Sequence, residues 1–444
     1  MAAHGQLIVF EGQAAPVRGP GLSRVYETLI VVYLITLLFL YPYGIALSSD
    51  ASVKVPDLIG LVCIAFGAAI LMARQRVRPD LAFLALVGPF VLLELAYPTI
   101  GAVGYRRPAD VVSSLRAAVL WLPVILLPMI AAPAALPRFE HRLRQLFATA
   151  LWLNLLYAIV LIAVSLGHAP GWMAFTRYLA PWAVVPYFDP IEGLRPAGFF
   201  SSVTTLSAFA IVCLSYFYAS YIARRDHVDL YHTIGAAFLV LLTTARVAYA
   251  ATALIFLIGW FVLSPGRKLV ALGVGIAALA AILALVESTV GIEQAFHRFA
   301  RVAESGLLAD LSFGSRVSQI WPAALSVAAE YPFGSLISAT TVVGLIDSGY
   351  LTYYIQGKWV FVASVVLMLA GQLAIGFWCL RRPQFLPGGL MLLFVSIYLT
   401  LAMVITNPLR MPVVIAFVVF AFWKLRTEVG SRFVCFTPGA TSRP

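Results

Sequence analysis

The sequence is poor in charge. Charged residues make up 11% of its 444 positions, whereas a soluble domain is about a quarter charged. Apolar residues make up 62%, more than one globular core can bury and more than a disordered chain carries. A polytopic membrane protein is the class that remains. The net charge of +11 suits the basic excess on the cytoplasmic loops of such proteins. We expect no nucleic-acid partner, because no basic patch with interleaved aromatic residues occurs.

Several chemical signatures are also missing. The sequence has no D-x-D, no G-x-x-x-x-G-K-[ST], no H-E-x-x-H and no G-x-S-x-G. Its few cysteines form no C-x-x-C pair, which argues against a disulfide framework and a cysteine metal site. Only His168 and His297 fall in the segments expected on the outer side of the membrane. We therefore expect no metal site and no cofactor. The four cysteines are Cys63, Cys213, Cys379 and Cys435.

The apolar runs predict an all-α fold, a polytopic bundle of transmembrane helices. A bilayer core is crossed by a helix of about 20 apolar residues, and the sequence offers about twelve such segments. The first is no signal peptide, because it follows a polar leader and has no small-residue cleavage site. The expected spans are 25–47, 55–73, 81–97, 115–135, 146–166, 202–222, 232–245, 247–263, 269–287, 359–380, 387–405 and 411–423.

The distribution of lysine and arginine predicts the orientation. These residues are densest in the leader, in alternate connections and in the tail, so both termini are expected in the cytoplasm. Two outer connections are long, and loops of such length in a compact protein are usually functional or disordered. Both are rich in Trp, Tyr, Phe and Pro, so we expect them to be folded and to carry function. The expected division is a leader at 1–24, a bundle at 25–287 with an outer loop at 167–201, a large and partly helical outer loop at 288–358, C-terminal helices at 359–423 and a tail at 424–444.

Two arginines lie where apolar runs begin. Arg195 stands just before a span, and its guanidinium suits phosphate oxygens, although an arginine snorkelling to the membrane surface is the alternative. Arg246 separates two apolar runs. A charge at membrane depth is a functional hypothesis by default. The alternative is a tight outer turn at which Arg246 pairs with lipid phosphate.

The large loop offers a further arginine. Residues 316–329 read as an amphipathic helix with Ser315 as its N-cap and a kink at Pro322. Arg316 would then lie in the first turn, where free N–H groups and a guanidinium together favour an anion. A solvated loop arginine is the alternative.

Three more positions carry chemistry. Asp347 is a lone carboxylate beside several tyrosines and suits a base that takes a proton from a sugar hydroxyl, or else an N-cap for the following span. Glu94 is expected in a structural ion pair near the outer end of its span. Arg410, in a short outer turn, is a further candidate phosphate ligand. The expected partners of Glu94 are Arg106, Arg107 or Arg116.

The order of these motifs resembles the superfamily of O-antigen ligases and Wzy-type polysaccharide polymerases, over roughly residues 190–360. There are departures. Ser201-Ser202 stands where the family often has Asn-Pro, and Val327 stands where some polymerases have a glycine. The ligases typically have histidine in place of Asp347, which favours a polymerase. The matching elements are Arg195-Pro196-Ala197-Gly198, Thr243-Thr244-Ala245-Arg246, Arg316 with Trp321 to Leu325, Pro332-Phe333-Gly334, and Asp347-Ser348-Gly349-Tyr350-Leu351 with Gly357.

The resemblance implies a glycosyl transfer at the periplasmic face of the bacterial inner membrane. An enzyme of this kind joins oligosaccharide repeat units carried on undecaprenyl diphosphate, with inversion and without a metal, because arginines stabilise the leaving diphosphate. Asp347 is then the candidate base. An exopolysaccharide polymerase of the xanthan or acetan type is the narrower match. The residues implied in substrate binding are Arg195, Arg246, Arg316, Arg301, Tyr350 and Arg410.

The partners implied are the lipid-linked repeat unit, the growing glycan and membrane lipids, with a flippase and chain-length or export proteins as further candidates. Prenyl chains would need an apolar groove between spans. Two alternatives stay open. A ligase would pass the finished glycan to a different acceptor, and a flippase or other transporter would need charges along a path through the spans.

Overall fold

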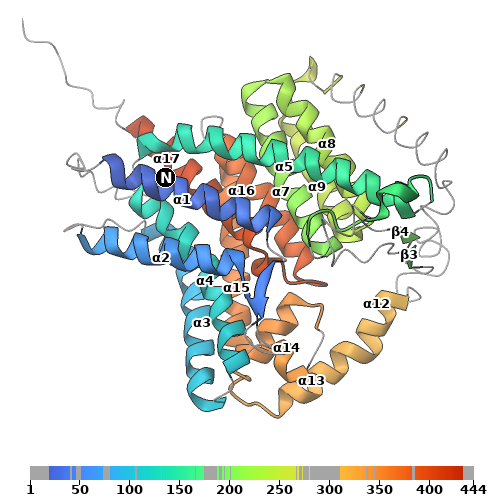
Figure 1. The fold of residues 1–444 in the computed structure, drawn as a ribbon. Coiled ribbons are helices and arrows are strands. Elements are labelled where there is room, and N and C mark those ends of the chain that lie inside the picture. Colours follow the sequence, from blue (N-terminus) through green and yellow to red (C-terminus); the bar gives the residue numbers. More distant parts are fainter. Residues whose placement is uncertain are drawn as a thin grey trace, which may run out of the picture.

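The computed structural model describes the chain in segments, which include all but one of the expected spans (Figure 1). Most of the expected span 269–287, the sites Arg195 and Arg301, and Arg106 and Arg107 lie outside the described residues. So do most of the leader and the end of the tail. The described residues are 20–40, 43–46, 52–73, 81–105, 108–131, 133–165, 167–174, 188–189, 193–194, 196–200, 202–266, 268–269, 273, 280, 311–336, 339–343, 346–382 and 386–433.

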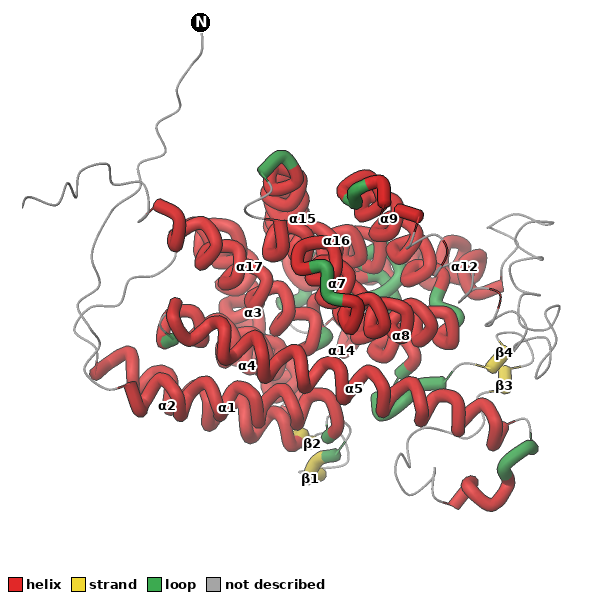
Figure 2. Tube along the Cα trace, turned by 90° about the horizontal axis from the view of Figure 1, so that it is seen from above, coloured by secondary structure: helices red, strands yellow, loops and turns green. Residues whose placement is uncertain are grey.

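Helices make up most of the described structure (Figure 2). Two short antiparallel pairs, β1 (Gly44–Ala46) with β2 (Ser52–Lys54) and β3 (Phe188–Asp189) with β4 (Gly193–Leu194), lie in connections. The helices are α1 (Pro20–Phe39), α2 (Val55–Ala73), α3 (Leu81–Tyr105), α4 (Pro108–Ile130), η1 (Pro133–Ala135), α5 (Leu136–Ser165), η2 (Pro170–Trp172), α7 (Val203–Arg224), α8 (His227–Thr243), α9 (Arg246–Val262), α12 (Leu311–Ser315), η4 (Arg316–Ile320), α13 (Trp321–Ala329), α14 (Ala339–Val343), α15 (Gly349–Leu380), α16 (Leu386–Ala402), η6 (Pro408–Arg410) and α17 (Pro412–Phe433).

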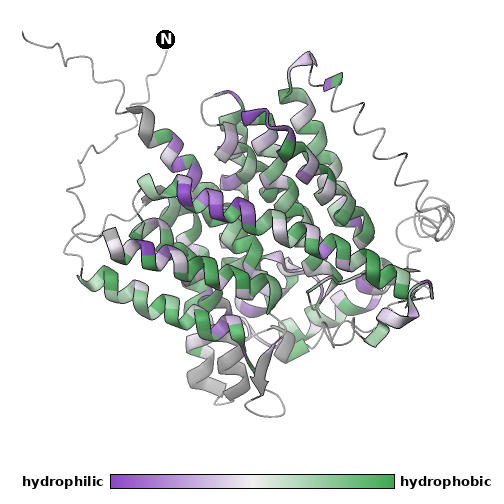
Figure 3. Ribbon diagram, turned by 45° about the horizontal axis from the view of Figure 1, so that its top comes forward, coloured by the Kyte–Doolittle hydropathy of each residue, from purple (hydrophilic) through white to green (hydrophobic). Residues whose placement is uncertain are grey.

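The protein is an all-α membrane protein. Among the described residues, 6 helices are long and apolar enough to cross a bilayer, and further apolar helices are shorter. Figure 3 shows the helices largely hydrophobic, with hydrophilic stretches mainly near their ends. The apolar window of α7 is 94% buried, whereas that of α2 is 33% buried. α7 is therefore a central helix, and α2 presents most of its surface outward. The spans long and apolar enough lie in α1, α2, α3, α5, α7 and α15.

The helix bounds agree with some expected spans and correct others. α2 matches 55–73 at both ends. α1 ends at Phe39, so the expected span 25–47 is too long, because Pro42 disfavours helix before it and the chain then enters β1. α5 and α17 begin earlier or end later than expected. Their extra turns carry charged residues that make ion pairs, so these helices continue beyond the apolar stretch.

Ion pairs join several helices at one end of the bundle. Glu140 of α5 accepts hydrogen bonds from Arg224 of α7 and from Lys424 of α17, the latter at 2.6 Å. Nη2 of Arg144 lies 2.7 Å from Oδ2 of Asp226, which stands between α7 and α8. That guanidinium and the Val228 N–H hold the pKa of the Asp226 carboxyl below its usual range. All these segments were expected on the same side of the membrane.

The opposite end carries a second set of polar contacts. Arg116 of α4 pairs with Asp57 of α2 at 2.6 Å, and the Lys54 N–H also donates to that carboxylate. Of the three arginines expected near Glu94, Arg116 therefore pairs with Asp57 instead, and the other two lie outside the described residues. Figure 1 shows the β1–β2 pair and helices α13 and α14 gathered at this lower end of the bundle.

Candidate functional site

The structure brings together two of the residues singled out in the sequence. The Arg316 Nε donates to Asp347 Oδ2 at 2.9 Å, and Nη2 of the same guanidinium lies 2.8 Å from that oxygen. The side chains are 21% and 27% exposed, so the pair is accessible from solvent. An arginine able to bind an anion and a carboxylate able to accept a proton thus lie in direct contact.

Arg316 lies inside a helical run. α12, the π-helical turn η4 and α13 follow one another without interruption from Leu311 to Ala329. Ser315 is helical and makes no capping hydrogen bond, so its expected role as N-cap is wrong. Arg316 therefore does not stand in a first turn, so its guanidinium is not placed beside the free N–H groups of a helix start. The wide turn ends where the N–H of Trp321 reaches the Arg316 carbonyl, just before Pro322, which has no N–H to donate.

Asp347 does not cap the helix that follows. Ser348 is the N-cap of α15, and its side chain accepts the Leu351 N–H at 3.3 Å. The alternative reading of Asp347 as a helix cap is therefore wrong. The Gly349 N–H is directed at the carbonyls of Met403 and Thr406, each at 2.9 Å. The carboxylate is thus held at the start of a helix that is anchored on the turn between α16 and η6.

The described part of the large loop is folded, as its composition indicated. α13, α14 and the first turns of α15 enclose a small apolar cluster of their own, separate from the main core. Its buried members are Ala324, Ala328, Ala339, Ile346 and Ile355. This cluster joins the helix that follows Arg316 to the helix that follows Asp347.

α15 is broken at Gly357 and Lys358, where the backbone leaves the helical region. The expected span 359–380 begins directly after this break. The Ile355 carbonyl accepts the Ser335 N–H at 2.8 Å, and the Gln356 carbonyl accepts the Leu336 N–H at 3.1 Å. At the break, the backbone therefore lacks hydrogen bonds of the helix and instead makes hydrogen bonds to the loop after α13.

Lys358 holds the break in a conformation that is rare outside glycine. Its φ is 55° and its ψ is −151°, which costs about 1–3 kcal/mol for a residue with a side chain. Its ammonium donates to the Ala328 carbonyl near the end of α13 and lies 5.1 Å above the Tyr354 ring. Strain of this kind persists where surrounding contacts fix it.

Arg410 and Tyr350 lie near the same two helices. Arg410, in η6, donates from Nη2 to Gln356 Oε1 at 2.9 Å and lies over the Tyr353 ring. Tyr350 is half-buried and packs on the main core, while its N–H points at the Met403 carbonyl. Arg410 thus contacts the helix that follows Asp347, and the described contacts link it to Gln356 instead of to Arg316.

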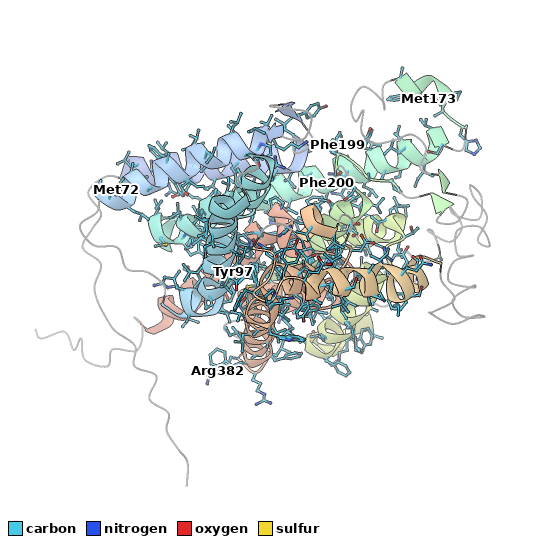
Figure 4. The ribbon with its side chains drawn as sticks, turned by 90° about the horizontal axis from the view of Figure 1, so that it is seen from below. Met72, Tyr97, Met173, Phe199, Phe200 and Arg382 are labelled. Atoms are coloured by element: carbon cyan, nitrogen blue, oxygen red, sulfur yellow. The ribbon has the colours of Figure 1, made fainter. Side chains whose placement is uncertain are left out.

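Gly198, the glycine of the element that begins at Arg195, stands where a larger residue would not fit. Gly198 has a φ of +60°, and a Cβ there would lie 2.4 Å from Oδ1 of the buried Asn154. That oxygen accepts the Phe199 N–H at 3.0 Å, and the Phe199 ring stacks on Tyr157. Phe199 and Phe200 are labelled in Figure 4. The turn after Arg195 is thereby fixed on α5.

Arg246 is the first residue of α9 and is half-buried. The turn that separates α8 from α9 is tight, with Thr244 in the left-handed conformation. The Tyr249 hydroxyl donates to the Leu241 carbonyl across this turn at 2.6 Å. The backbone therefore turns tightly between α8 and α9, directly before Arg246.

Sequence reasoning missed Gln356 and Lys358, whose contacts fix the break in α15, and Asn154, which fixes the turn after Arg195. The polar residue within the apolar run of α5 was the available signal for Asn154, and the Gln-Gly pair before a span was the signal for Gln356. Among the described residues, no group of three or more histidine, cysteine, aspartate or glutamate side chains is placed to hold a metal ion.

Comparisons with known proteins leave the family open. No protein-family model matches the chain, and no curated protein matches it.

Proposed function

We propose that the protein is a polysaccharide polymerase that joins oligosaccharide repeat units carried on undecaprenyl diphosphate at the periplasmic face of the bacterial inner membrane. The single observation that carries the proposal is the contact between Arg316 and Asp347. The two residues are 31 positions apart in the sequence and carry opposite charges. They were predicted to have separate roles, yet their side chains meet at one solvent-accessible position.

The geometry suits an inverting transfer without bound metal. The acceptor hydroxyl attacks the anomeric carbon of the donor, and the bond from that carbon to the diphosphate oxygen breaks. The diphosphate leaves with the electron pair, and the hydroxyl proton passes to Asp347. Arg316 stabilises the charge that grows on the diphosphate, because a guanidinium offers several donors to phosphate oxygens.

The ion pair gives the site a resting state. While Arg316 binds Asp347 Oδ2, the guanidinium is engaged and the carboxylate is less available to a hydroxyl. A diphosphate that takes over Arg316 releases Asp347 beside the acceptor. Arg195, Arg246 and Arg301 are the further arginines assigned to the diphosphate and glycan, and Tyr350 is assigned to the sugar.

The proposed topology has about twelve spans, with both termini in the cytoplasm. Each expected span other than 269–287 overlaps a helix of the structure. The ion pairs at one end of the bundle join segments that the positive-inside rule puts on one side. The Arg316–Asp347 pair belongs to the large loop and therefore faces the periplasm.

A deletion strain tests the function. The expected result is single repeat units on the lipid carrier, facing the periplasm, because the units are built and moved but not joined. Long chains left on the carrier would instead identify a ligase, and units left facing the cytoplasm would identify a flippase. Either of these outcomes would refute the polymerase.

A further inference from the structure

The helix that follows Asp347 is short and lies between two partners. This first part of α15 runs from Gly349 to Gln356 and ends at the break at Gly357. The Tyr353 and Gln356 side chains on it are 0% and 1% exposed. Asp347 lies two residues before the start of this helix. Contacts that fix the first part of α15 therefore also fix the position of the candidate base.

One face of the first part of α15 lies on the turn between α16 and η6. Gly349, Tyr353 and Gln356 are spaced by four and three residues, so they share this face. The Gly349 N–H points at the carbonyls of Met403 and Thr406, each at 2.9 Å. A Cβ at position 349 would lie 2.6 Å from the Met403 sulfur, so glycine is needed for this approach. The start of the helix thus lies directly on the turn.

The same turn and η6 contact the helix twice more, in the order of the sequence. The Tyr353 hydroxyl donates to Asn407 Oδ1 at 3.4 Å. Nη2 of Arg410 donates to Gln356 Oε1 at 2.9 Å, and the Arg410 guanidinium lies 6.0 Å from the centre of the Tyr353 ring. A hydrogen bond from a charged donor is stronger than a neutral one, and a buried oxygen that loses its donor is costly. Arg410 therefore holds the end of the helix next to the break.

A different face of the first part of α15 packs against the helix that carries Arg316. Ile355 belongs to the small apolar cluster that also contains Ala324 and Ala328 of α13. At the break, the Lys358 ammonium donates to the Ala328 carbonyl. α13 continues without interruption from η4, which begins at Arg316. The first part of α15 is thus held by η6 on one face and joined to the Arg316 helix on another.

We infer that Arg410 is a positioning residue of the candidate site. By fixing Gln356, it fixes the helix that follows Asp347, and that helix in turn positions α13 and Arg316. The sequence suggested Arg410 as a phosphate ligand, whereas this inference assigns it to the scaffold that sets how Arg316 and Asp347 meet. The inference rests on the proposed function for its kinetic readout.

Three measurements on the purified full-length protein in detergent test this role. Polymerisation kinetics with lipid-linked repeat units give kcat and KM. Calorimetry gives the affinity for inorganic pyrophosphate, which would fall on loss of Arg410 if that residue held the diphosphate. Hydrogen exchange, followed by mass spectrometry, reports on the segments 331–336 and 349–356, whose backbones are hydrogen-bonded to each other beside the break.

Arg410→Met removes the donor and keeps a long side chain. We expect kcat to fall at least about tenfold, with KM changed less than about twofold, because the reacting groups are misplaced. The affinity for pyrophosphate should not fall, since Arg316 remains, and both segments should exchange several times faster. The matched control is Arg382→Met, which removes an arginine stacked on Trp378 at the other end of α15 and should change none of the three readouts.

Gln356→Leu shows whether Arg410 acts through the Gln356 side chain. It removes the acceptor and leaves every arginine in place, so it should reproduce the kinetics and the exchange of Arg410→Met. The double variant Arg410→Met/Gln356→Leu should be about as slow as the slower single variant, because both changes break the same contact.

Three results would overturn the inference. They are additive losses in the double variant, unchanged exchange in Arg410→Met, and a pyrophosphate affinity that falls in Arg410→Met as far as in Arg316→Ala. If the unaltered protein makes no polymer from repeat units, the proposed function fails, while the exchange rates of the two segments still decide whether Arg410 holds the break.

Discussion

Arg316 directs two of its nitrogens at a single oxygen of Asp347, from Nε at 2.9 Å and from Nη2 at 2.8 Å. The pair is partly exposed, and pairs of this kind typically contribute about 0–1 kcal/mol. An interaction this weak is readily displaced by a diphosphate, which carries more negative charge than one carboxylate. The resting contact is therefore compatible with a site that opens when substrate arrives.

Competition for Arg316 predicts opposite effects for two substitutions. Asp347→Asn should abolish polymerisation, because the amide cannot accept the hydroxyl proton. The same variant should bind inorganic pyrophosphate about two- to fivefold more tightly than the unaltered protein, since the carboxylate no longer competes. Arg316→Ala should lose both activity and pyrophosphate binding. Calorimetry in detergent measures the affinities.

Ser348→Ala is the control for this experiment. It removes the cap of α15 beside Asp347 and should cost about 1 kcal/mol of stability without changing pyrophosphate affinity. If Asp347→Asn binds pyrophosphate more weakly than the unaltered protein, the carboxylate supports the anion and the competition model is wrong.

Gly198 should tolerate no side chain. Gly198→Ala adds a Cβ at a φ of +60° and against the Asn154 side chain, so we expect a loss of about 1–3 kcal/mol. The measurement is thermal unfolding in detergent. Gly88→Ala is the matched control, because a Cβ there meets nothing within 4 Å and alanine favours the helix. Equal melting temperatures for the two variants would contradict the strain argument.

Apolar runs predicted where helices lie, because a segment that crosses a bilayer must pair its backbone polar groups within a helix. The span 55–73 coincides with α2, and the start of the span 359–380 falls at the break in α15. The helix ends were less predictable. α5 and α17 run on through charged turns because Glu140 and Lys424 pair across them, and such a partnership is invisible in one sequence.

The candidate site was predictable in its members but not in its connections. Arg316 and Asp347 stood out by charge and position, but nothing in the sequence showed that they touch. The N-cap of α15 is Ser348 and not its neighbour Asp347, because a shift of one residue changes which side chain meets the free N–H groups of the helix. Arg116, one of three arginines expected near Glu94, lies with Asp57 instead, a pairing between α2 and α4 that only packing reveals.

The charge cluster at the other end of the bundle predicts a strong non-additive effect. Lys424 is 6% exposed and Glu140 is 9% exposed, whereas Arg224 is 42% exposed and can reach water. Glu140→Gln should therefore leave Lys424 buried with only the 3.7 Å contact to Glu428 and should cost about 3–5 kcal/mol. Glu140→Gln/Lys424→Met should recover most of that loss, because neither buried charge remains.

Thermal unfolding of Glu140→Gln, Lys424→Met and the double variant gives the coupling directly. Asp226→Asn is the matched control, since its partnership with Arg144 is more exposed and should be worth about 1 kcal/mol or less. Additive losses in the double variant would show that Glu140 and Lys424 do not act as a pair.

Cysteine labelling tests the proposed sidedness on which the site depends. Phe333, in the loop after α13, is 82% exposed and should be labelled as Phe333→Cys by a membrane-impermeant maleimide added to intact cells stripped of their outer membrane. Arg382, labelled in Figure 4 and stacked on Trp378 at the end of α15, should react as Arg382→Cys only after the inner membrane is opened. In the sequence, Phe333 and Arg382 lie on either side of the apolar part of α15. If the reagent reaches only one of them from outside the cell, this helix must cross the membrane. Labelling of Arg382→Cys in unopened cells would put the candidate site in the cytoplasm, where a carrier-linked unit awaiting polymerisation does not lie.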